Sequence, residues 1–131
     1  GLMQVMPATA KQVTSDLGIK YNKKRLSSDE IYNIKIGSFY FNKLLKKFKG
    51  SIVLSTAAYN AGPGTINRWL KNYGDPRKFG VDPLIWIEMI PYYETRNYVK
   101  RVLSNDLIYR HKLGDSIINF DRARKNFGHK F

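Results

Sequence analysis

The segment from Ser51 to Tyr59, SIVLSTAAY, has no polar face, and this constrains the fold more than any other feature of the chain. Small and apolar residues would surround a helix formed here on every side. Such a helix belongs at the centre of a domain, because an exposed side would leave apolar surface in water. The small side chains of Ala57, Ala58 and Ala61 would let neighbouring helices approach closely. We therefore expect other helices to pack around this segment.

Proline and glycine divide the flanking sequence into helical segments. Pro7 suits a first helical position and Gly18 suits a left-handed stop, which predicts a helix over Pro7 to Leu17. The Gly62-Pro63-Gly64 turn ends the apolar segment, and TINRWLKNY follows as a short amphipathic helix closed by Gly74. No stretch alternates as a strand would, so the predicted fold class is all-α.

A capping pattern places the longest helix of the first half. Ser27 and Glu30 have the spacing of a capping box, in which each side chain satisfies a free backbone donor of the other residue. The apolar stripe that follows predicts a helix as far as Gly50. Before Ser27 we expect a basic loop from Lys20 to Arg25.

Two further helices are predicted in the second half. Asp82 followed by Pro83 reads as a cap and first helical residue, which opens a helix over LIWIEMI, and Pro91 breaks it. The segment YYETRNYVKRVLSNDLIYRHKLG then supplies the last long helix. We expect one domain over residues 1–113 and a basic, aromatic tail over residues 114–131.

The composition limits the classes of function. With 131 residues and 43% hydrophobic content, the chain can build one core, and it contains no apolar run long enough to cross a membrane. Twenty-three Lys and Arg against ten Asp and Glu give a formal net charge of +13, which fits an anionic partner such as nucleic acid, acidic lipid or anionic cell-wall polymer. Simple solubility explains the same charge if the lysines are spread over helix backs.

The chain lacks the residues that most catalytic mechanisms require. It contains no cysteine, and its only histidines, His111 and His129, have no carboxylates at ligand spacing, so we expect neither a metal nor a cofactor. No serine triad signature and no glycine-rich phosphate loop occurs. Carboxylates remain, among which the only glutamates are Glu30, Glu88 and Glu94.

The three glutamates differ in their surroundings. Glu30 is explained by its predicted cap. Glu88 stands among apolar residues, where desolvation would raise its pKa and make it a proton donor, although a structural carboxyl turned toward a basic partner fits as well. Glu94 lies in the first turn of the last helix, where it either complements the helix dipole or lines a cleft beside Tyr92, Tyr93 and Tyr98. Tyrosines interleaved with amides and carboxylates suit a sugar, which has apolar faces and polar edges.

Three segments, taken in order, carry a resemblance to a known family. GLMQVMPATA, STAAYNAGPGTINRWL and IEMIPYYETRNYVKRVL are similar to segments of the lytic transglycosylases of the soluble, lysozyme-like type, over Gly1 to about Tyr109. The resemblance implies an all-helical, lysozyme-like domain that clasps a glycan strand of peptidoglycan. It also implies cleavage of the β-1,4 bond between N-acetylmuramic acid and N-acetylglucosamine without water, which leaves a 1,6-anhydro end.

The resemblance implies one acid and a set of binding residues. The family uses a single glutamic acid in an ES motif upstream of GLMQ, and the apolar start of this chain, Gly1 to Val5, fits a polypeptide cut inside a larger domain. We therefore expect the general acid before Gly1 and no lytic activity from these residues alone. The positions that match the family's substrate-binding motifs are Met3, Gln4, Tyr59, Asn60, Glu94 and Tyr98. Glu88 matches a family carboxylate to which the resemblance gives no role.

Other functions stay open at this point. A goose-type lysozyme would share the architecture but let water attack, and a glycan-binding module would share the groove without the acid. A basic helical nucleic-acid binder is supported only by the charge. We favour peptidoglycan strands as the partner, with no nucleic acid, a peripheral contact with the anionic envelope, and a monomeric chain. Localisation to the periplasm or cell envelope follows from the place of that substrate.

Overall fold

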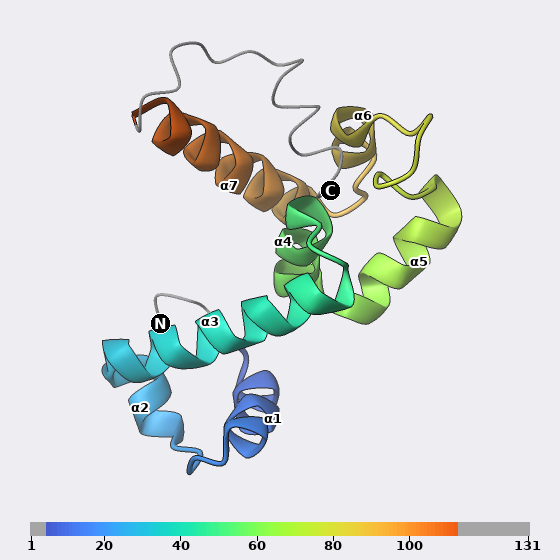
Figure 1. Cartoon of the computed structure of the whole chain (residues 1–131). Coiled ribbons are helices and arrows are strands. Elements are labelled where there is room, and N and C mark those ends of the chain that lie inside the picture. Colours follow the sequence, from blue (N-terminus) through green and yellow to red (C-terminus); the bar gives the residue numbers. More distant parts are fainter. Residues whose placement is uncertain (1–4, 113–131) are drawn as a thin grey trace. The chain divides into compact units, whose positions relative to one another are not determined.

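The computed structural model describes residues 5–112, in which every regular element is a helix and no strand occurs. This agrees with the predicted all-α class. The chain divides into two compact units, Gly1–Lys43 and Leu44–Phe131. Figure 1 shows the helices in chain order: α1 (Pro7–Leu17), α2 (Lys23–Ser28), α3 (Glu30–Lys47), α4 (Ile52–Ala61), α5 (Pro63–Tyr73), α6 (Pro83–Glu88) and α7 (Tyr93–Lys112). Among the described residues, no helix is both long and apolar enough to span a bilayer.

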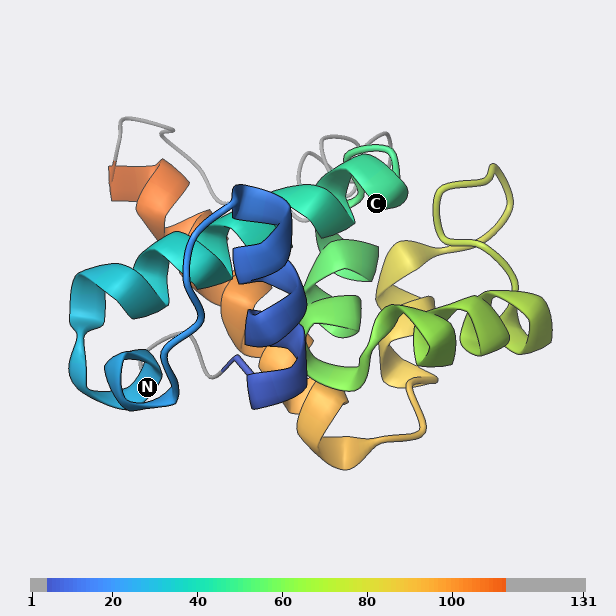
Figure 2. The same cartoon turned by 90° about the horizontal axis from the view of Figure 1, so that it is seen from below.

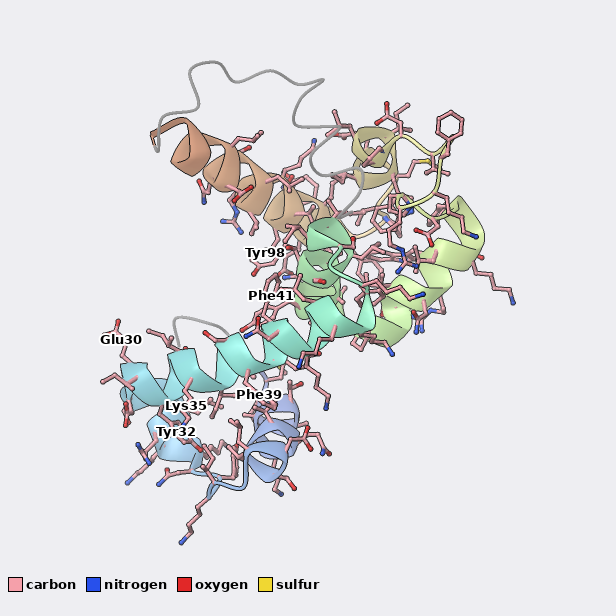
Figure 3. The ribbon with its side chains drawn as sticks, in the orientation of Figure 1. Glu30, Tyr32, Lys35, Phe39, Phe41 and Tyr98 are labelled. Atoms are coloured by element: carbon pink, nitrogen blue, oxygen red, sulfur yellow. The ribbon has the colours of Figure 1, made fainter. Side chains whose placement is uncertain are left out.

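In the first unit, α1 and α2 pack against the same side of α3. The buried core consists of one cluster contributed by all three helices: Ala10, Val13, Leu26, Tyr32 and Ile36. Phe39 packs against this cluster and lies on the side of α3 that faces α1, whereas Glu30 points away from both shorter helices (Figure 3). The bounds predicted for the first helix are confirmed, with Pro7 in its first turn and Gly18 as a left-handed cap at φ 69°.

The predicted loop from Lys20 to Arg25 is wrong in its second half, because α2 begins at Lys23. The Asn22 side chain accepts a hydrogen bond from the Arg25 backbone N–H at 3.1 Å and so caps this helix. The ring hydroxyl of Tyr32 accepts from the Asn22 N–H at 2.9 Å and donates to the Lys20 carbonyl at 3.2 Å. This buried tyrosine therefore fixes the short connection before α2. The helix α2 itself contains too few apolar residues to be predicted from an apolar pattern.

The capping box predicted from Ser27 is also wrong, and the cap of α3 is Asp29. Ser27 lies inside α2, where its hydroxyl donates to the Lys24 carbonyl at 3.2 Å. The Asp29 carboxylate accepts from the Tyr32 N–H at 3.1 Å, and its other oxygen accepts from the Arg25 guanidinium at 2.9 Å. One side chain thus ends α2 and begins α3, and this tight junction cannot be seen in the spacing of Ser27 and Glu30 alone.

In the second unit, α4 is the buried element. Six consecutive residues of α4, Val53 to Ala58, are buried, and Ser51 caps the helix by accepting from the Leu54 N–H at 3.1 Å. Its neighbours in space include α5 and α7 (Figure 2). The prediction that this segment lies at the centre of its domain is therefore confirmed within this unit.

A single glycine makes the corner between α4 and α5. Gly62 has φ 87° and ψ 146°, a conformation that only glycine adopts without strain, and its N–H donates to the Ala58 carbonyl at 2.8 Å. Pro63 then begins α5 at once. The direction of α5 is thus set by the residue that follows the last turn of α4.

The connection from α5 to α6, residues 74–82, is anchored at both ends. Near its start the Arg77 guanidinium holds both carboxylate oxygens of Asp75, at 2.9 and 2.7 Å. The Gly74 carbonyl accepts from the ring nitrogen of Trp86 at 2.9 Å. Asp82 caps α6 by accepting from the Leu84 N–H at 2.9 Å, which confirms the predicted cap.

We expect Ser51→Ala to destabilise the chain by about 1–2 kcal/mol, because the first turn of a buried helix loses its side-chain acceptor. Ser38→Ala, an exposed serine within α3, is the matched control and should change the free energy of unfolding by only about 0.5 kcal/mol or less. Urea denaturation followed by circular dichroism measures both. Equal effects of the two substitutions would contradict a capping role for Ser51.

The cap of α3 should make the stability of the first unit depend on acid. The Tyr32 backbone N–H, and next the Arg25 guanidinium, hold the pKa of the Asp29 carboxyl below its usual range. Its stabilising contribution is therefore present above the ordinary pKa of an aspartate, near pH 4, and is lost as the pH falls through the lower pKa of the folded state. Asp29→Asn keeps a capping oxygen but no ionisation, so its urea midpoint should fall less between pH 4 and pH 2 than that of the unaltered chain. Parallel curves would contradict this assignment.

Candidate functional site

The second and third motifs of the sequence meet where α4 packs against α7. The hydroxyl of Thr95 donates to the Asn60 side-chain oxygen at 2.6 Å. Thr95, Val99 and Leu103, spaced one turn apart, form the buried side of α7 in this region. Because α4 has no polar face, α7 can approach it closely, and the polar pair lies at the last turn of α4 beside the glycine corner.

Asn60 does not cap its own helix. The terminal bond of α4 comes from the Gly62 backbone N–H, whereas the Asn60 side chain is held by Thr95. Tyr59, its neighbour in the predicted site, is half-buried at the same end of α4. The AYN segment is therefore fixed by packing on one side and by a side-chain hydrogen bond on the other.

Glu94 and Tyr98 lie one turn apart on α7. Glu94 is exposed in the first turn, where the helix dipole favours a negative charge. Tyr98 is half-buried, and burial raises the pKa of its hydroxyl, with Arg101 opposing the shift. Figure 3 shows Tyr98 projecting from the first half of α7. A carboxylate and a neutral phenol at this spacing can bind hydroxyl and amide groups of one ligand.

A shallow groove of about 590 Å³ runs along the polar side of α7. It is lined by hydrogen-bonding side chains: Tyr93, Glu94, Asn97, Lys100, Arg101, Ser104 and Asn105. Only Glu94 of these belongs to the predicted site, and Tyr98 does not line the groove. Sequence reasoning found Glu94 but missed Asn97 and Arg101, whose spacing from Glu94 places them on the same side of the helix.

The aromatic residues beside Glu94 are held by other contacts. The Tyr92 ring meets the Trp69 ring edge to face, with centroids 5.1 Å apart. The Arg96 guanidinium lies 5.6 Å from the centroid of the Tyr93 ring, and Tyr93 is 71% exposed. Tyr93 thus offers an exposed ring to the groove that it lines, whereas Tyr92 is partly used in packing.

The prediction that Glu88 is desolvated is wrong, and the alternative of a basic partner is confirmed. The Glu88 carboxylate forms an ion pair with Lys100, and its side chain is 58% exposed. The apolar residues around it in the sequence, Trp86, Ile87 and Ile90, are buried on the other side of the chain. The helix turns the Glu88 side chain away from these residues. Their proximity to Glu88 in the sequence therefore does not mean that they bury it.

Two predicted site residues, Met3 and Gln4, lie outside the described residues. His129 and the tail over residues 114–131 also lie outside them, and the side chain of His111 is not described. Within residues 5–107, no group of His, Asp and Glu side chains could hold a metal ion.

Comparison with known proteins identifies the sequence family. The family model for the Transglycosylase SLT domain matches residues 1–80, and that for the Soluble lytic transglycosylase helical domain matches residues 89–116. The chain is 40% identical over 116 residues to the soluble lytic murein transglycosylase of Escherichia coli, covering 88% of this chain and 17% of that protein. It is 34% identical over 110 residues to a putative soluble lytic murein transglycosylase of Haemophilus influenzae, covering 84% and 18%.

Two solved structures are similar in fold. The lytic transglycosylase Slt of Pseudomonas aeruginosa, solved as an inactive mutant, is 42% identical with a TM-score of 0.73, over 86% of this chain and 18% of that one. The 70 kDa soluble lytic transglycosylase of E. coli is 40% identical with a TM-score of 0.76, over 88% and 18%. These likenesses confirm the all-α, lysozyme-like fold class. The chain spans less than one fifth of the length of these relatives.

The Asn60 and Thr95 side chains should be energetically coupled. We expect Asn60→Ala and Thr95→Val each to destabilise the chain, and the double variant to cost about 1 kcal/mol less than the sum, because the hydrogen bond can be lost only once. The matched control pairs Asn72→Ala with Thr95→Val, since Asn72 is an exposed asparagine of α5. Urea denaturation measures the cycle. Additive effects in the Asn60 cycle would show that the contact does not hold α4 to α7.

Proposed function

We propose that this chain, which belongs to the transglycosylase SLT domain family, binds the glycan strands of peptidoglycan as part of a lytic transglycosylase. The reaction proposed for the whole protein is cleavage of the β-1,4 bond from N-acetylmuramic acid to N-acetylglucosamine without water, with formation of a 1,6-anhydro end. The observation that carries this proposal is the bond of Thr95 to Asn60, since it brings the AYN and ETR segments together in one unit.

The side chains near this bond suit an aminosugar polymer. Glu94 and Tyr98 offer a carboxylate and a phenol one turn apart, and Tyr59 and Asn60 end the neighbouring helix. Pyranose rings present C–H faces that stack on aromatic rings, while hydroxyl and acetamido groups need hydrogen-bonding partners. We assign substrate contacts to Tyr59, Asn60, Glu94 and Tyr98, and extend them to Met3 and Gln4 of the first motif.

The general acid is proposed to lie outside these 131 residues. An acid for glycosidic cleavage needs a poorly solvated carboxyl group that stays protonated near neutral pH. All three glutamates of the chain, Glu30, Glu88 and Glu94, are exposed. We therefore assign the acid to a glutamate that precedes Gly1 in the whole protein, as the family's ES motif implies.

In the proposed reaction, one carboxyl group acts twice. It protonates the leaving oxygen, while the acetamido group of the muramic acid stabilises the cationic sugar carbon from within the substrate. The carboxylate left behind then takes the proton from O6 as O6 closes on that carbon. The residues of this chain bind and orient the two sugars, so that O6 rather than water reaches the reacting carbon.

A glycan-binding module is the second candidate, and the exposure of all three glutamates favours it for these residues taken alone. A goose-type hydrolase would differ only in letting water attack. Murein lies in the bacterial envelope, so we place the protein in the periplasm or envelope, acting as a monomer without metal or cofactor.

Binding by this chain can be tested with purified murein sacculi. We expect Glu94→Gln to weaken co-sedimentation about tenfold or more, because a charge-assisted hydrogen bond is lost. Glu30→Gln is the matched control, since Glu30 is also an exposed glutamate in a first helical turn and its loss changes the net charge equally. Equal effects of the two variants would remove Glu94 from the binding site.

The reaction itself is tested on the whole protein. Digestion of sacculi followed by mass spectrometry should give anhydro ends, each one water lighter than a reducing end. Glu→Gln substitution of the glutamate preceding GLMQ should abolish these products and leave sedimentation with murein intact. Reducing ends instead would establish a hydrolase, and lytic activity that survives the substitution would show that another group is the acid.

A further inference from the structure

A pocket in the first unit lies outside the candidate site. Its volume of about 400 Å³ is within the range of sites for small ligands, and its lining comes from the start of α1, from α2 and from α3. The apolar wall consists of Val5, Pro7 and Leu26. Leu26 is a buried member of the core cluster, and Val5 packs against that cluster. This wall is therefore held in place by the core of the unit.

The polar part of the lining is fixed as well. Asn33 is 2% exposed, and its side-chain amide donates to the Leu26 carbonyl at 3.0 Å. The Ser27 hydroxyl donates to the Lys24 carbonyl at 3.2 Å, so its oxygen can still accept a hydrogen bond. Both Asn33 and Ser27 line the pocket. A ligand with an N–H group can therefore find an acceptor in a wall that is already formed.

Two lysines, Lys23 and Lys24, also line the pocket and give it a positive charge. Both are exposed, and neither forms an ion pair with any residue that the structure describes. The dipole of α2 does not account for them, because they stand in its first turn, where a positive charge is disfavoured. Their charge is therefore available to a ligand.

The carboxylates nearest in sequence do not neutralise these lysines. Asp29 accepts from the Tyr32 N–H and from the Arg25 guanidinium, which together hold the pKa of its carboxyl below the usual range. Glu30 points away from α1 and α2 (Figure 3). Among the described residues that line the pocket, none is an Asp or a Glu. An anionic group is therefore the ligand that suits this pocket.

We propose that this pocket, called the α2 pocket below, binds a carboxylate of an acidic peptide. Lys23 and Lys24 contact the carboxylate, Ser27 accepts from a peptide N–H, and the apolar wall contacts a small side chain. The proposal rests on the proposed function, because murein carries acidic peptides on its muramic acid residues. Val5 is bonded to Gln4, which we assign to the glycan, so the α2 pocket begins beside the first motif. The ligand then extends from the glycan strand to the peptide that branches from it.

The lining distinguishes a peptide from other ligands. No aromatic ring is found among the described residues of the α2 pocket, so a sugar would have no stacking partner there. Inorganic phosphate would satisfy the two lysines but leave the apolar wall uncovered. A duplex nucleic acid presents a long row of phosphates and needs more cations than one small pocket supplies. A carboxylate joined to amide groups and small side chains uses all three parts of the lining.

The test compares intact murein sacculi with sacculi from which an amidase has removed the peptides. We expect Lys23→Gln with Lys24→Gln to weaken co-sedimentation with intact sacculi roughly fivefold or more, and to leave binding to the stripped sacculi within about twofold. Stripped sacculi keep the lactyl carboxylate of muramic acid. Equal losses on the two kinds of sacculi would therefore show that the lysines bind this group, and would overturn the assignment to the peptide.

A matched control separates the α2 pocket from the overall charge. Lys11→Gln with Lys20→Gln removes the same charge from exposed lysines of the first unit that do not line the pocket. This double variant should keep its binding to intact sacculi within about twofold of the unaltered chain, because its charges are far less engaged by the ligand. A loss as large as that of the pocket variant would overturn the proposal.

Filling the α2 pocket provides a second test. Ser27 and Ser28 are both exposed and both donate to the Lys24 carbonyl, but of the two only Ser27 lines the pocket. Ser27→Leu should therefore weaken binding to intact sacculi roughly fivefold or more, whereas Ser28→Leu should change it about twofold or less. Circular dichroism checks that both variants are folded. Equal effects of the two substitutions would contradict a ligand in this pocket.

Further measurements distinguish failure of this proposal from failure of the glycan proposal. The soluble peptide L-alanyl-γ-D-glutamyl-meso-diaminopimelate should compete with intact sacculi, and the same peptide with amidated carboxylates should not. Equal competition by both peptides would overturn the α2 pocket assignment. Glu94→Gln should weaken binding to intact and stripped sacculi alike, because it removes a glycan contact. If Glu94→Gln has this effect while the Lys23 and Lys24 variant has none, the peptide proposal fails and the glycan proposal stands.

Discussion

The burial of α4 is the constraint on which the second unit depends. A helix with no polar side contributes nothing to solubility and can persist only when its neighbours cover it. Its first turn would leave unpaired backbone donors inside the protein, and Ser51 satisfies one of them. Its last turn ends at Gly62, which needs no side chain to stop it. The residues of α4 and of its two caps therefore determine where this helix begins and ends and require that it be buried. The helices α5 and α7 pack around it.

The candidate site follows from this burial. Small residues in α4 let α7 come close, and the contact leaves Asn60 and Thr95 to pair at the edge of an otherwise apolar interface. On α7, the same turn that buries Thr95 leaves Glu94 exposed and Tyr98 half-buried. The side chains of the candidate site are therefore positioned by two helices that are held together by apolar packing and by the bond of Thr95 to Asn60.

The sequence predicted helices well where one residue decides the conformation and poorly where a tertiary contact does. Pro7 and Gly18 bounded α1, and Asp82 with Pro83 began α6, because proline and glycine act through their own backbone. Lys23–Ser28 escaped recognition since α2 depends on Tyr32, ten residues away, to hold its start. The sequence left two interpretations of Glu88 open, a proton donor or the partner of a basic residue, because Lys100, with which it pairs, lies on another helix. Of the candidate site, the pairing of Asn60 with Thr95 could not be predicted, since it joins residues 35 apart.

The one-residue corner at Gly62 limits how this architecture can diverge. An insertion between α4 and α5 would change the direction of α5, which begins at Pro63, relative to α4. Because α4 has no polar side, such a change would expose apolar surface. Nor can another amino acid replace the glycine cheaply, although the space beside it is open, because the backbone itself is in a conformation that side chains oppose. Changes in length among descendants of this gene should therefore accumulate in residues 74–82 and spare the corner.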